Sequence, residues 1–225
     1  MNLKLLIMIK LLANNSIVKC FLSAINNEIG SIQPVLSIAK IVRKVRKARE
    51  EKSTNSETGG FNQKNQGEFL PIYLHTDASQ AFLYEEIDTR KMGVDLITLD
   101  SHKVYGPRGV GLLWVRRTLL QVLQKAPVVA GGHQEGGIRA GTEAVPTIVA
   151  FAYALCLAQK RRTKDVKYVS HLRDIFISTL TKTLPKGSFH INCADRAMCA
   201  PHIISISFPV RDHEELLFRL DAVGI

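Results

Sequence analysis

The sequence predicts an α/β protein with a mainly parallel sheet, followed by a smaller α+β unit. Apolar, β-type runs at residues 16–24, 70–74 and 96–99 alternate with helical or polar segments, and such alternation gives parallel strands. Each run ends abruptly in polar residues, where open α/β sheets bind ligands. Farther on, the order becomes two helices, two strands and a helix. We therefore expect a partial large domain over residues 1–150 and part of a small C-terminal domain over 151–225.

Hydrophobic patterning predicts the first elements. Residues 1–13 fit a helix or a strand equally, and residues 16–24 read as a buried strand. Pro34 suits the first turn of a helix that runs to about Arg49. Residues 50–68 are a low-complexity insertion of polar residues, for which we expect a disordered or exposed loop.

Three further strands are expected over residues 70–74, 96–99 and 110–115, with a short helix over 116–124. Asp77 follows the first of these strands, where it could cap a helix or bind a ligand. A glycine-rich loop over 131–142 carries His133, Arg139 and Thr142 but lacks the known nucleotide-binding spacings. This loop could bind an anion such as phosphate or carboxylate, form a subunit contact, or be only a flexible connection.

The predicted small domain continues the pattern. Helices are expected over residues 143–162 and 164–184, and the second ends there because Pro185 and Gly187 follow. Strands follow at 189–191 and 203–208, and Asp212 begins a last helix.

Composition narrows the function classes. The formal net charge of +10 is concentrated at residues 40–49 and 160–167, where basic and apolar residues alternate at helical spacing. No aromatic residues lie among them, so solvated helix faces are favoured over a nucleic-acid site. Lys10 interrupts the apolar start, which lacks a cleavage site and is too short to span a membrane. We expect a cytoplasmic protein without membrane or direct nucleic-acid binding.

The four cysteines show no metal-binding spacing, and no metal site is predicted. Cys20 and Cys156 lie in apolar runs and read as core thiols. Cys193 and Cys199 have no nearby histidine pair to complete a zinc site. A reducing compartment fits this pattern best.

Polar residues at the three strand ends form one candidate site. Lys103 follows the strand at 96–99 and could act as a nucleophile or form a Schiff base, although a surface lysine in a turn remains an alternative. An acid such as Asp77 beside it suits pyridoxal 5'-phosphate (PLP), because a carboxylate keeps the pyridine nitrogen protonated. The remaining polar groups could bind the ring hydroxyl (Gln80 or Asn27) and the phosphate (His102 and Ser101).

Four segments resemble, in order and spacing, the motif set of cysteine desulfurases of the class V aminotransferase fold: residues 26–30, 75–81, 101–109 and 131–143. The resemblance extends from about Ile17 to the end of the chain, apart from the insertion at 50–68. It implies a fold type I PLP-dependent transferase. Enzymes of this family take sulfur from L-cysteine, which leaves L-alanine and an enzyme persulfide. A sulfur-acceptor or scaffold protein then receives the sulfur for iron–sulfur cluster assembly or tRNA thiolation.

The resemblance also implies a role for each candidate residue. By this resemblance, Lys103 forms the Schiff base with PLP, Asp77 pairs with the pyridinium nitrogen and Gln80 hydrogen-bonds the ring oxygen. Asn27 lies near that oxygen and the substrate, His102 contacts the phosphate, and Thr142 reaches the phosphate of the partner subunit in a homodimer.

Departures from the family pattern are informative. The family's phosphate loop and ring-stacking histidine precede the region that this chain matches, and its persulfide cysteine and substrate-binding arginine follow the segment matched by residues 220–225. We therefore expect an internal fragment that is inactive alone. Asp100 stands where many relatives have a phosphate-binding serine, so either Ser101 takes that role or Asp100 points away. Another class V enzyme, such as a selenocysteine lyase, and a non-catalytic partner of a full-length desulfurase remain alternatives.

Overall fold

The computed structural model describes residues 19–56, 71–125, 127–193, 195–209 and 213–225. The chain forms two compact units, of which the first comprises Met1–Ile25 and Gln33–Arg162 and the second Asn26–Ile32 and Thr163–Ile225. The expected element at residues 1–13 lies outside the described residues, as does the part of the insertion from residue 57 onward. The domain boundary at residue 150 stays a prediction.

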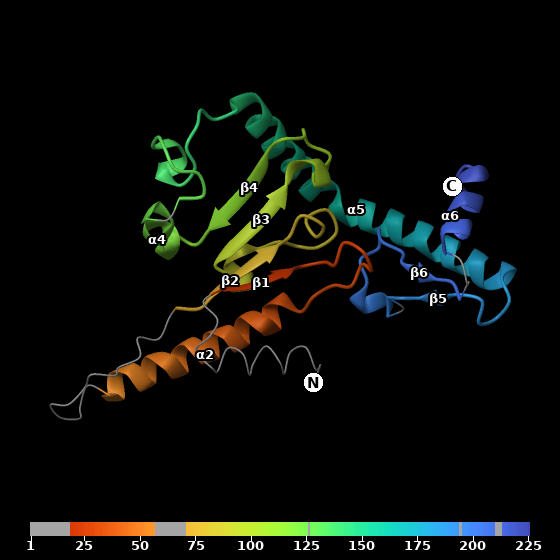
Figure 1. Ribbon diagram of the computed structural model, residues 1–225, viewed down its shortest axis with the longest axis horizontal. Helices are drawn as coiled ribbons and strands as arrows, with labels where there is room; N and C mark the ends of the chain where they lie inside the picture. The colour runs from red at the N-terminus through yellow and green to blue at the C-terminus, as the bar shows by residue number, and fades with distance from the viewer. Residues whose placement is uncertain (1–18, 57–70, 126, 194, 210–212) are drawn as a thin grey trace. The chain divides into compact units, whose positions relative to one another are not determined.

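The first unit contains a four-stranded sheet in the order β1-β2-β3-β4 (Figure 1). The strands are β1 (Lys19–Ser23), β2 (Tyr73–Asp77), β3 (Leu96–Asp100) and β4 (Gly111–Val115). β1, β2 and β3 pair in parallel, and β4 pairs antiparallel with β3. The predicted α/β class with a mainly parallel sheet is confirmed. Because β2 and β3 run in the same direction, their carboxyl ends lie at one edge of the sheet.

Helix α2 (Val35–Ser56) follows β1 and buries Val35, Ile38, Ala39 and Val42. Its start agrees with the helix predicted from Pro34. Its end does not, because residues 50–56 continue the helix where an exposed loop was expected. Glu50, Glu51 and Lys52 are good helix formers, so a polar composition alone did not end the helix. The short helices of this unit are α3 (Thr89–Met92), η1 (Ser101–Val104), η2 (Arg117–Leu119), α4 (Leu120–Lys125) and η3 (Gln134–Gly137).

Asp95 joins several elements of the first unit. It is 3% exposed, and its carboxylate accepts hydrogen bonds from the Leu74 amide at 2.9 Å and from Arg116 Nε at 3.0 Å. It also forms an ion pair with Arg46 of α2, whose Nε donates to the Ile72 carbonyl at 2.8 Å. A buried carboxylate is tolerated only when its charge is paired and hydrogen-bonded in this way.

A single long helix, α5 (Val145–Thr183), replaces the two helices predicted over 143–162 and 164–184. No glycine or proline lies between Thr147 and Thr183, so the basic run in its middle does not interrupt it. In the first unit, Phe151, Ala154 and Ala158 of α5 are buried. Among the described residues, no helix is both long and apolar enough to cross a membrane.

The second unit contains the rest of α5, the hairpin of β5 (His190–Ile191) and β6 (Ile206–Ser207), the turn η4 (Arg196–Met198) and helix α6 (His213–Ala222). The segment 26–32 joins this unit through backbone hydrogen bonds. The Ile32 amide donates to the Met198 carbonyl and the Ala200 amide donates to the Gly30 carbonyl, both at 2.8 Å. Gly30 has φ 75°, and a Cβ there would lie 2.9 Å from Ile203 Cβ, so only glycine fits.

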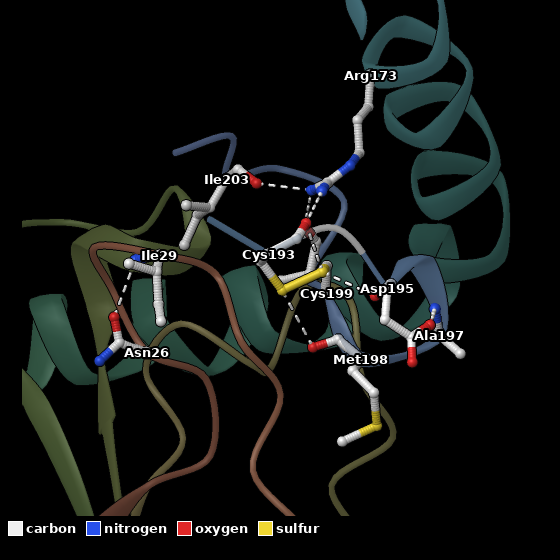
Figure 2. Close-up of a disulfide and its surroundings, with 10 residues drawn as sticks. Asn26, Ile29, Arg173, Cys193, Asp195, Ala197, Met198, Cys199 and Ile203 are labelled. Atoms are coloured by element: carbon white, nitrogen blue, oxygen red, sulfur yellow. Dashed lines mark hydrogen bonds between the residues drawn. A yellow bond between two sulfur atoms is a disulfide. The ribbon is translucent and has the colours of Figure 1, made fainter. Parts of the chain in front are cut away.

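A disulfide between Cys193 and Cys199, whose Cα atoms are 5.9 Å apart, closes the loop that holds segment 26–32 (Figure 2). Sequence spacing did not indicate this pair. Burial of Cys20 is confirmed, and that burial raises the pKa of its thiol. The prediction that Cys156 is a core thiol is wrong, because this residue is exposed on α5.

The half-buried His202 should make the free energy of unfolding of the second unit decrease at acidic pH. Burial lowers its pKa from 6.5 to about 4. Between pH 6.5 and 4 the imidazole of His202 binds a proton in the unfolded chain but not in the folded chain. The free energy of unfolding is therefore highest above pH 6.5 and decreases as the pH falls toward 4. We expect a loss of about 1–2 kcal/mol, allowing for partial solvent exposure of the ring.

Urea unfolding curves from pH 7 to 4 measure this effect. His202→Gln should flatten the pH dependence, whereas His190→Gln, at an exposed position on β5, should not. An unchanged pH slope in His202→Gln would contradict the assignment.

Candidate functional site

Two neighbouring strand ends bring the candidate residues together. Asp77 is the last residue of β2, and its register partner on β3 is Thr98. Asp100 is the last residue of β3, and His102 and Lys103 follow at once on η1. The parallel pairing of β2 and β3 therefore places two acids, a histidine and a lysine at or next to one sheet edge.

An open pocket of about 760 Å³ lies at this edge, a volume within the range of small-molecule sites. Its walls come from the ends of β2 and β3 and from the turn that leads into β4. The lining residues are Asp77, Ser79, Thr98, Leu99, Asp100, His102, Arg108, Gly109, Val110 and Gly111. Carboxylate, imidazole and guanidinium groups thus surround one cavity, which suits a ligand that carries both an anionic group and a cationic nitrogen.

Asp77 shapes the wall at the end of β2. Its Oδ1 accepts a hydrogen bond from the Ser79 amide at 2.9 Å, and residues 79–84 continue as turns. Asp77 thus caps the turns that follow it, although these turns do not form a regular helix. The hydrogen bond fixes the carboxylate at the strand end, where it lines the pocket.

The turn after β3 determines where its side chains lie. Asp100 caps η1, because its Oδ1 accepts hydrogen bonds from the His102 amide at 3.3 Å and pairs with His102 Nδ1 at 2.7 Å. Tyr105 has φ 62° and the Gly106 amide returns to the Ser101 carbonyl at 2.9 Å, which closes the turn. As a result, His102 and Lys103 are exposed.

Ser101 differs from its neighbours on η1. It is fully buried, and among the described residues its Oγ has no hydrogen-bond partner. The hydroxyl lies against Gly106, where any Cβ would collide with it. The lining of the pocket includes Asp100 and His102 on either side of Ser101, but not Ser101 itself.

Four other predicted residues take different positions. Lys103 follows the lining residue His102 on η1, but its side chain is exposed and it is not among the lining residues; Gln80, half-buried in the turn after β2, is also outside the lining. Thr142 is exposed at the end of the glycine-rich loop, where its carbonyl is 3.4 Å from Arg139 Nη1. Asn27 is exposed in the second unit, in a turn that the Asn26 side chain closes by accepting from the Glu28 and Ile29 amides at 2.9 Å. Their ligand-binding roles stay predictions.

Sequence reasoning missed three polar residues of the pocket. Thr98 interrupts the apolar run of β3, and that irregularity was the available signal. Arg108 stands in the turn Gly106–Gly109 that follows Lys103, and a cationic residue between glycines so close to the predicted site was the available signal. Ser79 carried no signal beyond its place after Asp77.

The pocket residues fit PLP in their chemistry. Asp77 supplies a fixed carboxylate for a pyridinium nitrogen, and Arg108, His102 and the backbone around Gly109 supply donors for a phosphate. Lys103 lies one residue from His102. No cluster of three or more His, Cys, Asp or Glu residues suitable for a metal occurs within the described ranges.

Comparison with known proteins gives consistent matches. The family model for aminotransferase class V matches residues 64–225. The chain is 33% identical to a mitochondrial cysteine desulfurase of Candida albicans, with 90% of this chain and 36% of the relative covered. It is 32% identical to the cysteine desulfurase IscS of Dictyoglomus turgidum, with coverages of 89% and 43%. The chain therefore spans less than half the length of these two curated relatives.

Solved structures agree. A NifS-like protein superposes with a TM-score of 0.72 at 28% identity, covering 92% of this chain and 48% of that protein. A NifS-like protein from Rickettsia africae also superposes with a TM-score of 0.72, and at 23% identity it shows the shared fold alone.

Proposed function

Because the chain belongs to the class V aminotransferase family, we propose that its pocket binds PLP and serves a cysteine desulfurase reaction. The supporting observation is that Asp77, at the end of β2, and His102, on the turn after β3, line one pocket, and that Lys103 directly follows His102 on η1. In this proposal L-cysteine is the substrate, and its sulfur passes to an acceptor or scaffold protein. A homodimer and a cytoplasmic location belong to the same proposal, although some relatives are named as mitochondrial.

Each pocket residue has a defined task in this proposal. Asp77, held by the Ser79 amide, keeps a proton on the pyridine nitrogen. His102 and Arg108 bind the phosphate, and Lys103 attaches to the aldehyde carbon. When bound, PLP supplies an electron-withdrawing ring that stabilises negative charge at the substrate's α-carbon.

The remaining assignments rest on the family resemblance. In this proposal Gln80 hydrogen-bonds the ring oxygen and Asn27 lies near that oxygen and the substrate. Ser101 stays a candidate phosphate ligand despite its buried position. Thr142, exposed on the glycine-rich loop, reaches the phosphate of the partner subunit.

Lys103→Ala tests the proposal. We expect the purified chain mixed with PLP to form a covalent bond that borohydride reduction makes permanent and that peptide mass spectrometry locates at Lys103. The variant should lose this labelled peptide and its visible absorbance, because alanine has no amine to react. Cofactor attachment is the readout because the chain spans less than half of its relatives' length.

Lys91→Ala is the matched control, since Lys91 is an exposed lysine of the same unit whose side chain is 71% exposed. It should label like the parent chain. Equal labelling of the parent and Lys103→Ala would reject the proposed site. Absence of attachment in every chain would favour the non-catalytic interaction protein.

A further inference from the structure

Asp100 is one of the residues that line the pocket. The same lining contains His102 and Arg108, the two residues whose side chains suit an anion. Asp100 is thus a lining residue, whereas Ser101, which the sequence offered as the alternative phosphate ligand, is fully buried and outside the lining.

Asp100 also engages one of these two groups directly. His102 Nδ1 lies 2.7 Å from Asp100 Oδ1, and the His102 amide donates to the same oxygen at 3.3 Å. These contacts hold the imidazole against a carboxylate. A phosphate that used Nδ1 would have to displace Asp100, and one that used Nε2 would be bound close to a negative charge.

The balance of charge in the pocket makes this contact important. Among the described lining residues, two carboxylates, Asp77 and Asp100, face one guanidinium, Arg108. Asp77 lies on the neighbouring strand, where its Oδ1 accepts from the Ser79 amide. Asp100 is thus the carboxylate that acts on the anionic end of a ligand. Its side chain is 41% exposed, so water and salt weaken the repulsion without abolishing it.

We infer that Asp100 determines the pocket's selectivity, lowering its affinity for phosphorylated pyridoxal relative to unphosphorylated pyridoxal. The inference rests on the proposed PLP site. It predicts a pocket that holds its cofactor more loosely than one with a neutral residue at position 100.

Asp100→Asn isolates the charge. Asparagine has nearly the same shape and keeps an oxygen that can cap η1. We expect the Kd for PLP to fall about tenfold, the size appropriate to one charge at a partly solvated site, while the Kd for pyridoxal changes less than about twofold. The PLP effect should shrink with added KCl, because salt screens exposed charges. Absorbance titrations measure both ligands.

Two controls accompany this variant. Glu86→Gln removes one negative charge from an exposed site that is outside the described pocket lining, and it should alter neither Kd. Asp100→Ser, which also removes the charge and can still cap a helix, should reproduce the effect of Asp100→Asn.

The outcomes are distinct. Equal tightening of PLP and pyridoxal, or no tightening of PLP, would overturn the inference while leaving the PLP site standing. If no chain binds PLP, the proposed function fails. Inorganic phosphate then still tests the role of Asp100: it should raise the Tm of Asp100→Asn more than that of the parent, and an equal rise would overturn the inference.

Discussion

Replacing Asp95 with alanine is expected to lower the free energy of unfolding of the first unit by about 3–5 kcal/mol. The carboxylate is 3% exposed and accepts hydrogen bonds from Leu74, Arg116 and Arg46. Alanine would leave a buried amide and two guanidinium groups without this acceptor. The loss is large because these donors lie on separate elements, all of which hydrogen-bond to the one buried carboxylate.

Fluorescence of Trp114 measures this effect. It is the single tryptophan of the sequence and pairs with Ile97 of β3, so it reports on the sheet of the first unit during urea unfolding. Asp95→Asn keeps an acceptor oxygen and should cost less than alanine. Asp221→Ala, at an exposed position on α6, should change stability by less than about 0.5 kcal/mol. A similarly small change for Asp95→Ala would contradict the role of this carboxylate.

Replacing Arg173 with methionine should destabilise the second unit by about 3 kcal/mol or more. Arg173 is 6% exposed, and its guanidinium donates to the carbonyls of Ala200 at 2.8 Å, Ile203 at 2.7 Å and Cys193 at 3.1 Å (Figure 2). Methionine fills similar volume but donates to none of these carbonyls, so they would stay buried without their charged donor.

Hydrogen–deuterium exchange locates the consequence of this change. The amides of Ile32 and Ala200, which join segment 26–32 to the disulfide loop, should exchange faster in Arg173→Met. Arg173→Lys should recover only part of the protection, because one ammonium group cannot reproduce the guanidinium fork. Lys167→Met, exposed on the same helix, serves as control. Unchanged exchange at both amides would show that Arg173 does not hold this loop.

Much of the sheet could be predicted because apolar runs between polar turns leave few arrangements for a strand. The continuity of the long helix α5 was not predicted, since two helices were expected, divided between Arg162 and Lys164. In the structure Arg162 stays helical and donates to the Phe82 carbonyl at 3.1 and 3.2 Å. Partners so distant in the sequence are not visible in local composition.

The candidate site could be predicted only in part, because part of it depends on the path of a turn. Asp77 and His102 could be placed in one pocket because parallel strands end at one edge. The buried position of Ser101 and the contribution of Arg108 depend on the path of the turn after β3, which closes through the left-handed Tyr105. The Cys193–Cys199 pair depends on a 5.9 Å approach of two Cα atoms that a spacing of six residues does not specify.

That disulfide also limits where the chain could carry sulfur. Of the four cysteines, all of which the structure describes, Cys193 and Cys199 have no thiol while they are paired. Cys20 is buried and its raised pKa disfavours the nucleophilic thiolate. Cys156 is thus the one exposed thiol. Any persulfide formed on this chain in its oxidised state would have a single accessible position, on a helix surface outside the described pocket lining.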